Sequence, residues 1–270
     1  MNYDKYIDLI EQERYGEAVR YKCSQIPNVL YKYCWLDGDA EKNELRLATL
    51  EAGQIYLATL EQFNDPFEGK AFIFDEDKLI EKGWKKEQFE DYIKEMNSKW
   101  RVCCFANPDE KQQNMPMWAY YANNHQGFCV EYNMSLEQKK YLYPVSYDEK
   151  RVSGNVILGN LLNGIMAMMK YAEDSSHMPG EISAFIHLAL LSITCKHISW
   201  QHEKEVRALV PATFGIYFPA IPSKIFIGMN CSEQNTSRIV EIAKKFPECK
   251  VYKMKDALEG ADFYLEEQIL

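Results

Sequence analysis

Hydrophobic and polar positions recur with two different periods along the chain, which predicts both helices and strands. In residues 86–98, Phe89, Ile93 and Met96 fall on one face of a helix. Residues 205–210 instead alternate charged and apolar side chains, which is typical of a strand with one buried face. Similar patterns predict further helices in 1–25, 43–52, 115–122, 154–172, 181–195 and 233–246, and strands at 29–35, 55–59, 101–106, 128–132, 141–147, 224–228 and 250–254.

The order of these elements predicts the fold class. Strands occur along the whole length with helices between them, so we expect an α/β (α+β) protein built on a single mixed or split β-sheet. We expect the 270 residues to form one domain. Residues 1–27 would be a helical N-terminal extension and residues 29–255 the α/β core. Within that core, the helical pair in 154–195 interrupts the strands and is interpreted as an insertion packed on the sheet.

Charge and composition exclude some classes of protein. The net charge is -9, and no cluster of Lys and Arg rises above this acidic background, which argues against a general DNA or RNA coat. The N-terminus lacks the apolar core of a signal peptide, and the most apolar stretch, 182–193, is too short to span a membrane. We therefore expect a cytoplasmic protein whose ligand is a small molecule or nucleotide.

The eight cysteines form no C-x-x-C pair, and without an export signal we expect them to be reduced and unpaired. The chain also lacks the G-x-G-x-x-G, P-loop, H-E-x-x-H and G-x-S-x-G patterns. These absences predict no metal site and no conventional nucleotide loop or serine nucleophile.

Four segments place polar residues beside aromatic ones, a composition suited to a ligand site. The intervening helices look like amphipathic cover, so we expect Lys32, Asn64, Trp118 and Glu205 to line one cleft. The four segments are residues 30–33 (LYKY) with 53–57 (GQIYL), residues 63–68 (FNDPFE), residues 117–122 (MWAYYA) with 125–132 (HQGFCVEY), and residues 196–207, the last with Lys196, Trp200, Glu203, Glu205 and Arg207.

These segments, in this order, resemble the bacterial domain-of-unknown-function family DUF2971. The resemblance covers roughly residues 29–230, and the FNDPFE loop and the final segment are its most specific parts. The position before Tyr121 is often a histidine in that family, whereas this chain has Tyr120. The family has no established activity, so the resemblance implies no mechanism.

The layout is also similar, more distantly, to the ADP-ribosyltransferases, which hold NAD in the cleft of a split sheet. Their pattern has an Arg or His on an early strand, where this chain has Lys32, and a late Glu-x-Glu, here Glu203 and Glu205. The resemblance implies these three as catalytic residues and NAD as the cofactor. The candidates for NAD binding, through aromatic faces and polar groups, are Tyr31, Tyr33, Asn64, Asp65, Trp118, Tyr121, Trp200 and Arg207.

The late Glu-x-Glu has a physical interpretation of its own. If residues 203–207 form one strand, Glu203, Glu205 and Arg207 share a face, with the carboxylates about 7 Å apart. Such a pair can face the positive charge that develops as the nicotinamide–ribose bond breaks, while Arg207 or Lys196 limits their mutual repulsion. In that case Glu205→Gln should reduce activity strongly and change stability little. The alternatives are a solvated strand face with weak surface ion pairs and a buried structural network.

The leading hypothesis is an ADP-ribosyltransferase-like enzyme that cleaves NAD, and two alternatives stay open. Asp65, Glu68 and Lys70 loosely match the Asp…Glu-x-Lys pattern of metal-dependent nucleases, which favours a nucleic-acid-acting protein, either a nuclease or a binding module, in phage defence. The third hypothesis is a non-catalytic domain that binds a small molecule through the aromatic cleft. The sequence thus leaves both an enzyme and a binding module open.

Overall fold

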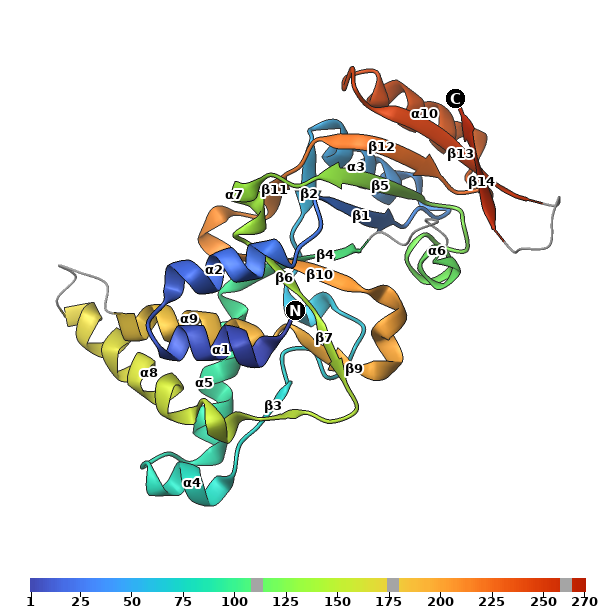
Figure 1. The fold of residues 1–270 in the computed structure, drawn as a ribbon. Coiled ribbons are helices and arrows are strands. Elements are labelled where there is room, and N and C mark those ends of the chain that lie inside the picture. Colours follow the sequence, from blue (N-terminus) through green and yellow to red (C-terminus); the bar gives the residue numbers. More distant parts are fainter. Residues whose placement is uncertain (108–113, 174–179, 258–263) are drawn as a thin grey trace.

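The computed structural model describes residues 1–107, 114–173, 180–257 and 264–270, and its centre is a mixed eight-stranded sheet (Figure 1). This confirms the predicted α/β class. The sheet strands are β1 (Val29–Cys34), β4 (Trp100–Ala106), β5 (Phe128–Asn133), β6 (Leu142–Pro144), β10 (Glu205–Pro211), β12 (Pro222–Ile227), β13 (Lys250–Asp256) and β14 (Leu265–Ile269). Their order is β14-β13-β12-β5-β1-β4-β10-β6, and neighbours are antiparallel except for the parallel pair β12–β13.

The sheet is split in its middle. Strand β1 pairs with β5 along its whole length, and β10 pairs with β4 along its whole length. Between β1 and β4, however, only one pair of residues is in register, Tyr31 opposite Ala106. The sheet therefore consists of a five-stranded half and a three-stranded half (β4, β10 and β6) that diverge beyond this pair.

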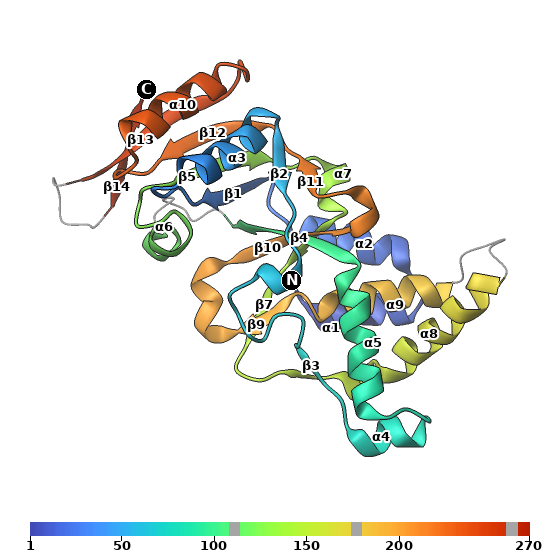
Figure 2. The same ribbon diagram turned by 180° about the vertical axis from the view of Figure 1, so that it is seen from behind.

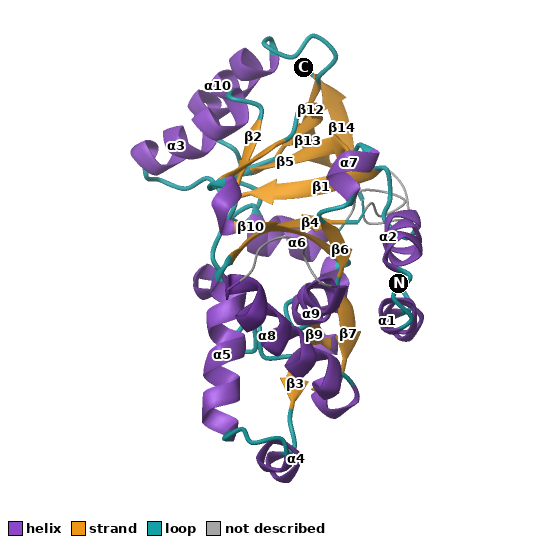
Figure 3. Cartoon of the chain, turned by 90° about the vertical axis from the view of Figure 1, so that its left-hand side faces the viewer, coloured by secondary structure: helices purple, strands orange, loops and turns teal. Residues whose placement is uncertain are grey.

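Helices cover both faces of the five-stranded half. Figure 3 shows α3 (Ala40–Glu51) and α10 (Glu233–Ala243) together on one side. Because side chains alternate along a strand, Leu30 packs toward these two helices, whereas Tyr31 packs toward α6 (Met115–Tyr121) on the other side. The same alternation puts Val130 and Ile225 in the first core and Cys129 and Phe226 in the second.

A helical layer lies beside the three-stranded half (Figure 2). Its members are α1 (Tyr3–Glu11), α2 (Tyr15–Ser24), α5 (Lys86–Ser98), α8 (Leu158–Glu173) and α9 (Gly180–Leu191). Tyr6, Phe89, Leu161 and Phe185 belong to its core. The helices predicted at 1–25 and within 154–195 are thus confirmed, although α9 ends at Leu191.

A buried lysine ties the N-terminal helices to the sheet. Lys22 of α2 is fully buried, and its ammonium donates to the carbonyl oxygens of Lys140 (2.6 Å), Leu142 (2.8 Å) and Lys139 (3.3 Å). Burial lowers the pKa of Lys22 to about 7. Since three carbonyl groups take the place of water around this ammonium, the contact fixes α2 against the start of β6.

A tight turn sets the end of α6 against the sheet. Asn123, Asn124 and His125 all have a positive φ, which Asn tolerates better than most residues. A Cβ atom at Gly127 would lie 2.0 Å from the carbonyl oxygen of Cys34, so only glycine fits there. The position of α6 next to β1 is therefore fixed by the backbone itself.

The remaining elements are short, and most were not predicted, because two or three residues show no clear period. The expected strand 141–147 is two strands, β6 and β7 (Ser146–Asp148), since β7 leaves the sheet to pair with β9 (Cys195–His197). That pairing also corrects the end of the helix expected at 181–195. The other short elements are α4 (Glu76–Glu81), α7 (Leu136–Lys139), β2 (Gln54–Tyr56), β3 (Phe72–Ile73), β8 (Val152–Ser153), β11 (Tyr217–Pro219) and the 3-10 turns η1 (Leu60–Gln62), η2 (Gly154–Val156), η3 (Ile198–Glu203) and η4 (Ala212–Phe214).

Two expectations about chemistry can be compared with the fold. All eight cysteines are unpaired, which confirms the prediction of free thiols. Across the part of the chain that the structure describes, no helix combines the length and apolar character needed to cross a bilayer.

The helical layer should lose stability in mild acid. The Tyr6 hydroxyl lies 2.6 Å from Nδ1 of His187, and burial, together with the charge of Lys22, lowers the pKa of His187 to about 4. The unfolded chain takes up this proton near pH 6.5, so stability should fall as the pH drops from about 6.5 to about 4, by roughly 3 kcal/mol. Urea unfolding across this window should show a clearly smaller pH dependence in His187→Gln, while His197→Gln, at an exposed position, should behave like the parent. Equal pH dependence in all three proteins would contradict this assignment.

Candidate functional site

A cavity of about 340 Å³ opens where the sheet splits. One wall comes from β1 and the other from β4, and the rim comes from residues 56–64, α6 and the segment that leads into β10. Its lining residues are Tyr31, Lys32, Tyr33, Tyr56, Ala58, Gln62, Phe63, Asn64, residues 102–106, Met117, Tyr121, Lys196, Glu203 and Glu205. All four segments singled out in the sequence therefore meet at one place.

Three of the four residues expected in the cleft line it, and Trp118 does not. Lys32, Asn64 and Glu205 border the cavity. Trp118 is almost fully buried behind it, edge-on to Tyr33 at 5.2 Å and stacked on His125 at 5.7 Å. On a helix, residues four apart share a face, so α6 presents Met117 and Tyr121 to the cavity and turns Trp118 into the core.

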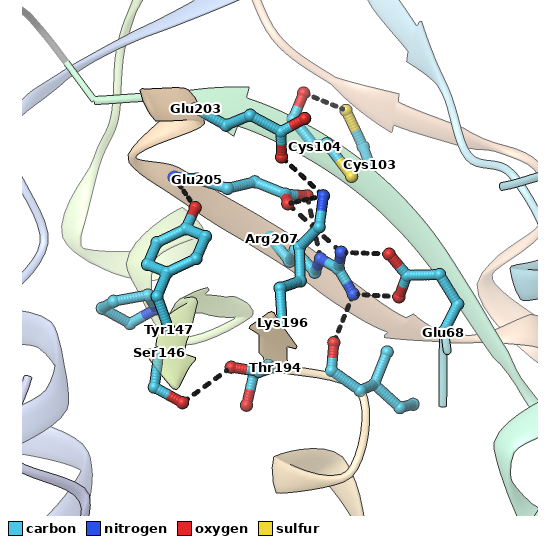
Figure 4. Close-up of polar contacts among 12 residues, drawn as sticks. Glu68, Cys103, Cys104, Ser146, Tyr147, Thr194, Lys196, Glu203, Glu205 and Arg207 are labelled. Atoms are coloured by element: carbon cyan, nitrogen blue, oxygen red, sulfur yellow. Dashed lines mark hydrogen bonds and ion pairs between the residues drawn. The ribbon is translucent and has the colours of Figure 1, made fainter. Parts of the chain in front are cut away.

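The two late glutamates reach the site by different routes. Glu205 begins β10, but Glu203 ends η3, and Lys204 between them is left-handed (φ 44°). The strand predicted at 205–210 is confirmed, whereas the assumption that Glu203 shares one face of that strand with Glu205 and Arg207 is wrong. Both carboxylates nevertheless converge on the ammonium of Lys196, at 2.5 Å for Glu203 and 3.3 Å for Glu205 (Figure 4).

Arg207 lies beneath this pair and is fully buried. Its guanidinium donates to both oxygens of Glu68 at 2.6 Å, to Glu205 at 2.8 Å and to the carbonyl oxygen of Ile193 (Figure 4). It also lies 5.4 Å from the ring centre of Phe63. The solvated-face alternative is therefore wrong, and Arg207, expected to bind NAD, supports the site from below without lining the cavity.

The buried cluster around Lys196 and Arg207 contains three carboxylates but only these two cations. Glu68, Glu203 and Glu205 face Lys196 and Arg207. Burial favours a protonated Glu205, but the charges of Arg207 and Lys196 outweigh burial and lower its pKa to about 2. Burial and the charge of Glu205 raise the pKa of Glu203. The site thus pairs a firmly ionised carboxylate with a neighbour that gains a proton more easily.

Tyrosine hydroxyls complete the shell around the carboxylates. The Tyr121 hydroxyl donates to Glu203, and the Tyr147 hydroxyl accepts the backbone N–H of Glu205 at 2.8 Å. The ammonium of Lys196 lies 4.8 Å from the ring centre of Trp200. Trp200, which was expected to bind the ligand, therefore packs over Lys196 and does not line the cavity. Burial and the charge of Glu205 raise the pKa of the Cys104 thiol, which keeps it protonated at neutral pH.

The nuclease-like residues do not assemble into a metal site. The carboxylate of Asp65 accepts a hydrogen bond from the backbone N–H of Phe67 at 2.9 Å, as a turn cap does. Asp65 also lines a different cavity from Glu203 and Glu205. Both oxygens of Glu68 are bound to Arg207, and the ammonium of Lys70 donates to the carbonyl oxygen of Pro66. Among the residues that the structure describes, no group of three His, Cys, Asp or Glu side chains could hold a metal ion.

Sequence reasoning did not predict the partners of several residues of this site. Glu68, Lys196 and Tyr56 lay inside the chosen segments, but contacts with residues distant in sequence give no local signal. Gln62 and Cys104 were not singled out, because Gln62 lies in a short connection with no recognisable pattern and Cys104 has the pattern of any buried strand residue. Only the approach of β4 to β1 brings these groups to the cavity.

Comparison with known proteins agrees with one of the two resemblances. Residues 117–208 match the family described as "Protein of unknown function (DUF2971)". This match confirms the resemblance to DUF2971 over a shorter stretch than expected, from α6 to β10. No curated protein and no solved structure gave a significant match, and the resemblance to ADP-ribosyltransferases is not shown by these comparisons.

The buried network makes Glu68 and Glu205 important for stability. Glu68→Gln or Glu205→Gln leaves the charge of Arg207 underpaired in a buried place, which should cost roughly 3–5 kcal/mol in the free energy of unfolding. For Glu205 this replaces the expectation of little change. The control is Glu44→Gln, which removes an exposed carboxylate from the partly buried Arg238 and should cost far less, since Arg238 keeps Glu51 as a partner. Urea unfolding measures all three, and similar losses at Glu68 and Glu44 would contradict the assignment.

Proposed function

We propose that this protein cleaves the bond between nicotinamide and ribose in NAD, either by hydrolysis or by transfer of ADP-ribose. The observation that carries the proposal is the carboxylate pair of Glu203 and Glu205 on the wall of the 340 Å³ cavity. The cluster around them has an excess of one carboxylate over its cations. Lys32 also lines the cavity and offsets this excess, so the position of the two carboxylates, and not a net charge, is what favours a cationic pyridinium–ribose group beside them.

The chemistry follows from where charge develops. The bond from the ribose carbon to the ring nitrogen breaks, its electron pair goes to the nitrogen, and nicotinamide leaves as a neutral molecule. Positive charge then lies on the ribose, and an ionised Glu205 facing it lowers the barrier. In hydrolysis, water adds to the ribose carbon and loses a proton, which yields ADP-ribose. No acid is needed for the leaving group, so a carboxylate held at a low pKa suits this reaction.

The other lining residues suit the rest of the substrate. The rings of Tyr31, Tyr33 and Tyr56 offer surfaces for nicotinamide or ribose, and the amide of Asn64 offers hydrogen bonds to a carboxamide. Lys32 supplies a cation on the same wall for the pyrophosphate. The cavity is large enough for the nicotinamide riboside half, since small-ligand sites begin at about 300 Å³.

A second candidate is a domain that binds a nucleotide without cleaving it. The observation that favours it is that both carboxylates already contact Lys196, and Glu205 also contacts Arg207. Groups held this firmly can serve recognition as well as catalysis. The two candidates share the cavity and differ only in turnover.

Release of nicotinamide from NAD, followed by chromatography, tests the proposal. We expect the parent to be active and Glu203→Gln and Glu205→Gln to be slower by about 100- to 1,000-fold, as when one electrostatic stabiliser is removed. Glu203→Gln is the cleaner variant, because Glu203 pairs with Lys196 and not with Arg207, so its replacement leaves the partners of the buried guanidinium in place. The control is Glu51→Gln, a partly buried carboxylate at the end of α3 that pairs with Arg238 and Lys245 and lines neither cavity.

The possible outcomes separate the candidates. Unchanged turnover in a well-folded Glu203→Gln would remove Glu203 from the mechanism. A parent that NAD stabilises against heat but that releases no nicotinamide would be the binding domain. A parent that shows neither effect would refute both.

A further inference from the structure

A small side pocket lies next to the 340 Å³ cavity, across the side chains of Tyr31 and Tyr33. Both tyrosines belong to the core on the α6 side of the sheet, and both border the cavity and the side pocket. The cavity extends from them over β4 and β10. The side pocket extends the other way, over β5, β12 and β13, where Cys129, Phe226 and Met254 line it. A ligand that lies against the two tyrosines therefore reaches both spaces.

The side pocket has room for one small group and not for a ring. Its volume is about 10 Å³, which is roughly what a single water-sized group needs. A six-membered ring does not fit there. One substituent of a ring that stays in the larger cavity does, so the side pocket suits one end of a ligand.

Trp118 gives the side pocket a hydrogen-bond donor. Its side chain lines this space, although it does not line the larger cavity, and it is only 1% exposed. Among the residues that the structure describes, none accepts a hydrogen bond from its indole N–H. His125 cannot accept it, because its ring is stacked on the indole at an interplanar angle of 5° and the N–H points within the indole plane. A buried donor is unfavourable without an acceptor, so this N–H favours a ligand that supplies one.

The lining also shows which kind of acceptor fits. None of the described residues that line the side pocket is charged. Asn107 and Asn114 border it, and the amide nitrogen of Asn114 already donates to the carbonyl oxygen of His202. A carboxylate or phosphate buried there would have no cation beside it, which costs far more than burying a neutral group. The side pocket therefore favours a neutral carbonyl oxygen.

We propose that Trp118 determines the specificity of this site for nicotinamide, because its indole N–H donates to the carboxamide oxygen. The carboxamide is short and neutral and carries a carbonyl oxygen, so it matches the volume, the uncharged lining and the donor. The pyridine ring stays in the larger cavity against Tyr31 and Tyr33, and the ribose lies toward β10, where Glu205 begins the strand. This inference rests on the proposed function, since it takes NAD as the ligand.

NMR titration of the indole N–H groups tests the inference with free nicotinamide, which the reaction releases and does not consume. The comparison ligands change only its carboxamide. In 3-acetylpyridine the carbonyl oxygen is kept, in nicotinate a carboxylate replaces the amide, and in pyridine the group is absent. The chain has five tryptophans, so the Trp118 signal follows once Trp→Phe variants have assigned the other four, and this readout does not require Trp118→Phe to fold. The matched control is Trp84→Phe, which changes a partly buried indole of the helical layer that lines none of the three cavities.

We expect nicotinamide and 3-acetylpyridine to shift the Trp118 signal in a saturable way, and nicotinate and pyridine to bind about tenfold more weakly. Trp118→Phe should weaken nicotinamide by about tenfold and change pyridine little, as loss of one buried hydrogen bond predicts. Trp84→Phe should behave like the parent.

Three results would overturn the inference: no saturable binding of nicotinamide, binding that leaves the Trp118 signal unmoved, or equal affinity of the parent and a folded Trp118→Phe for nicotinamide. Release of nicotinamide from NAD, measured separately, distinguishes the two proposals. Release by a parent whose Trp118 signal does not move means that this inference fails and the proposed function stands. A shifted signal without any release means the reverse.

Discussion

The full burial of Arg207 is the constraint on which the centre of this structure depends. A guanidinium cannot lose its proton at any ordinary pH, so the fold must supply partners for a permanent charge in a dry place. Glu68 comes from the 63–69 loop, Glu205 from the start of β10, and a carbonyl oxygen from Ile193 after α9. These segments are far apart in sequence, and the need to satisfy one side chain holds them in one arrangement.

The same arrangement gives the cavity its electrostatic character. Because Glu205 is bound to Arg207, it stays ionised, and because Lys196 is shared between two carboxylates, Glu203 is only partly compensated. Groups that stabilise the fold are thus also groups that line the cavity. A change at Glu205 will act on both properties, whereas Glu203, which has no contact with Arg207, separates them better.

The cavity itself results from the geometry of the sheet. Strands β1 and β4 share only the pair Tyr31 and Ala106, so the two halves of the sheet diverge and leave room for side chains between them. The DUF2971 match, residues 117–208, contains all but the first two residues of α6, together with Lys196, Glu203 and Glu205, but neither β1 nor the 63–69 loop. The matched segment therefore supplies the carboxylates and their lysine, and the rest of the chain supplies the opposite wall and Glu68.

The sequence by itself determined the class of fold, most of the long elements and the segments that form the site, because periodic burial and local composition are properties of neighbouring residues. The spacing of Phe89 and Ile93 predicts a helix whatever that helix packs against. Local composition likewise indicated Lys32, Asn64 and Glu205 as residues of the site. Only the tertiary structure decided that Trp118 belongs to the core, that Glu203 lies off the strand, and that Glu68 belongs to Arg207. It also divided residues 141–147 between two sheets. Each of these outcomes depends on a contact with a residue distant in sequence. No local pattern shows which carboxylate will pair with which buried cation.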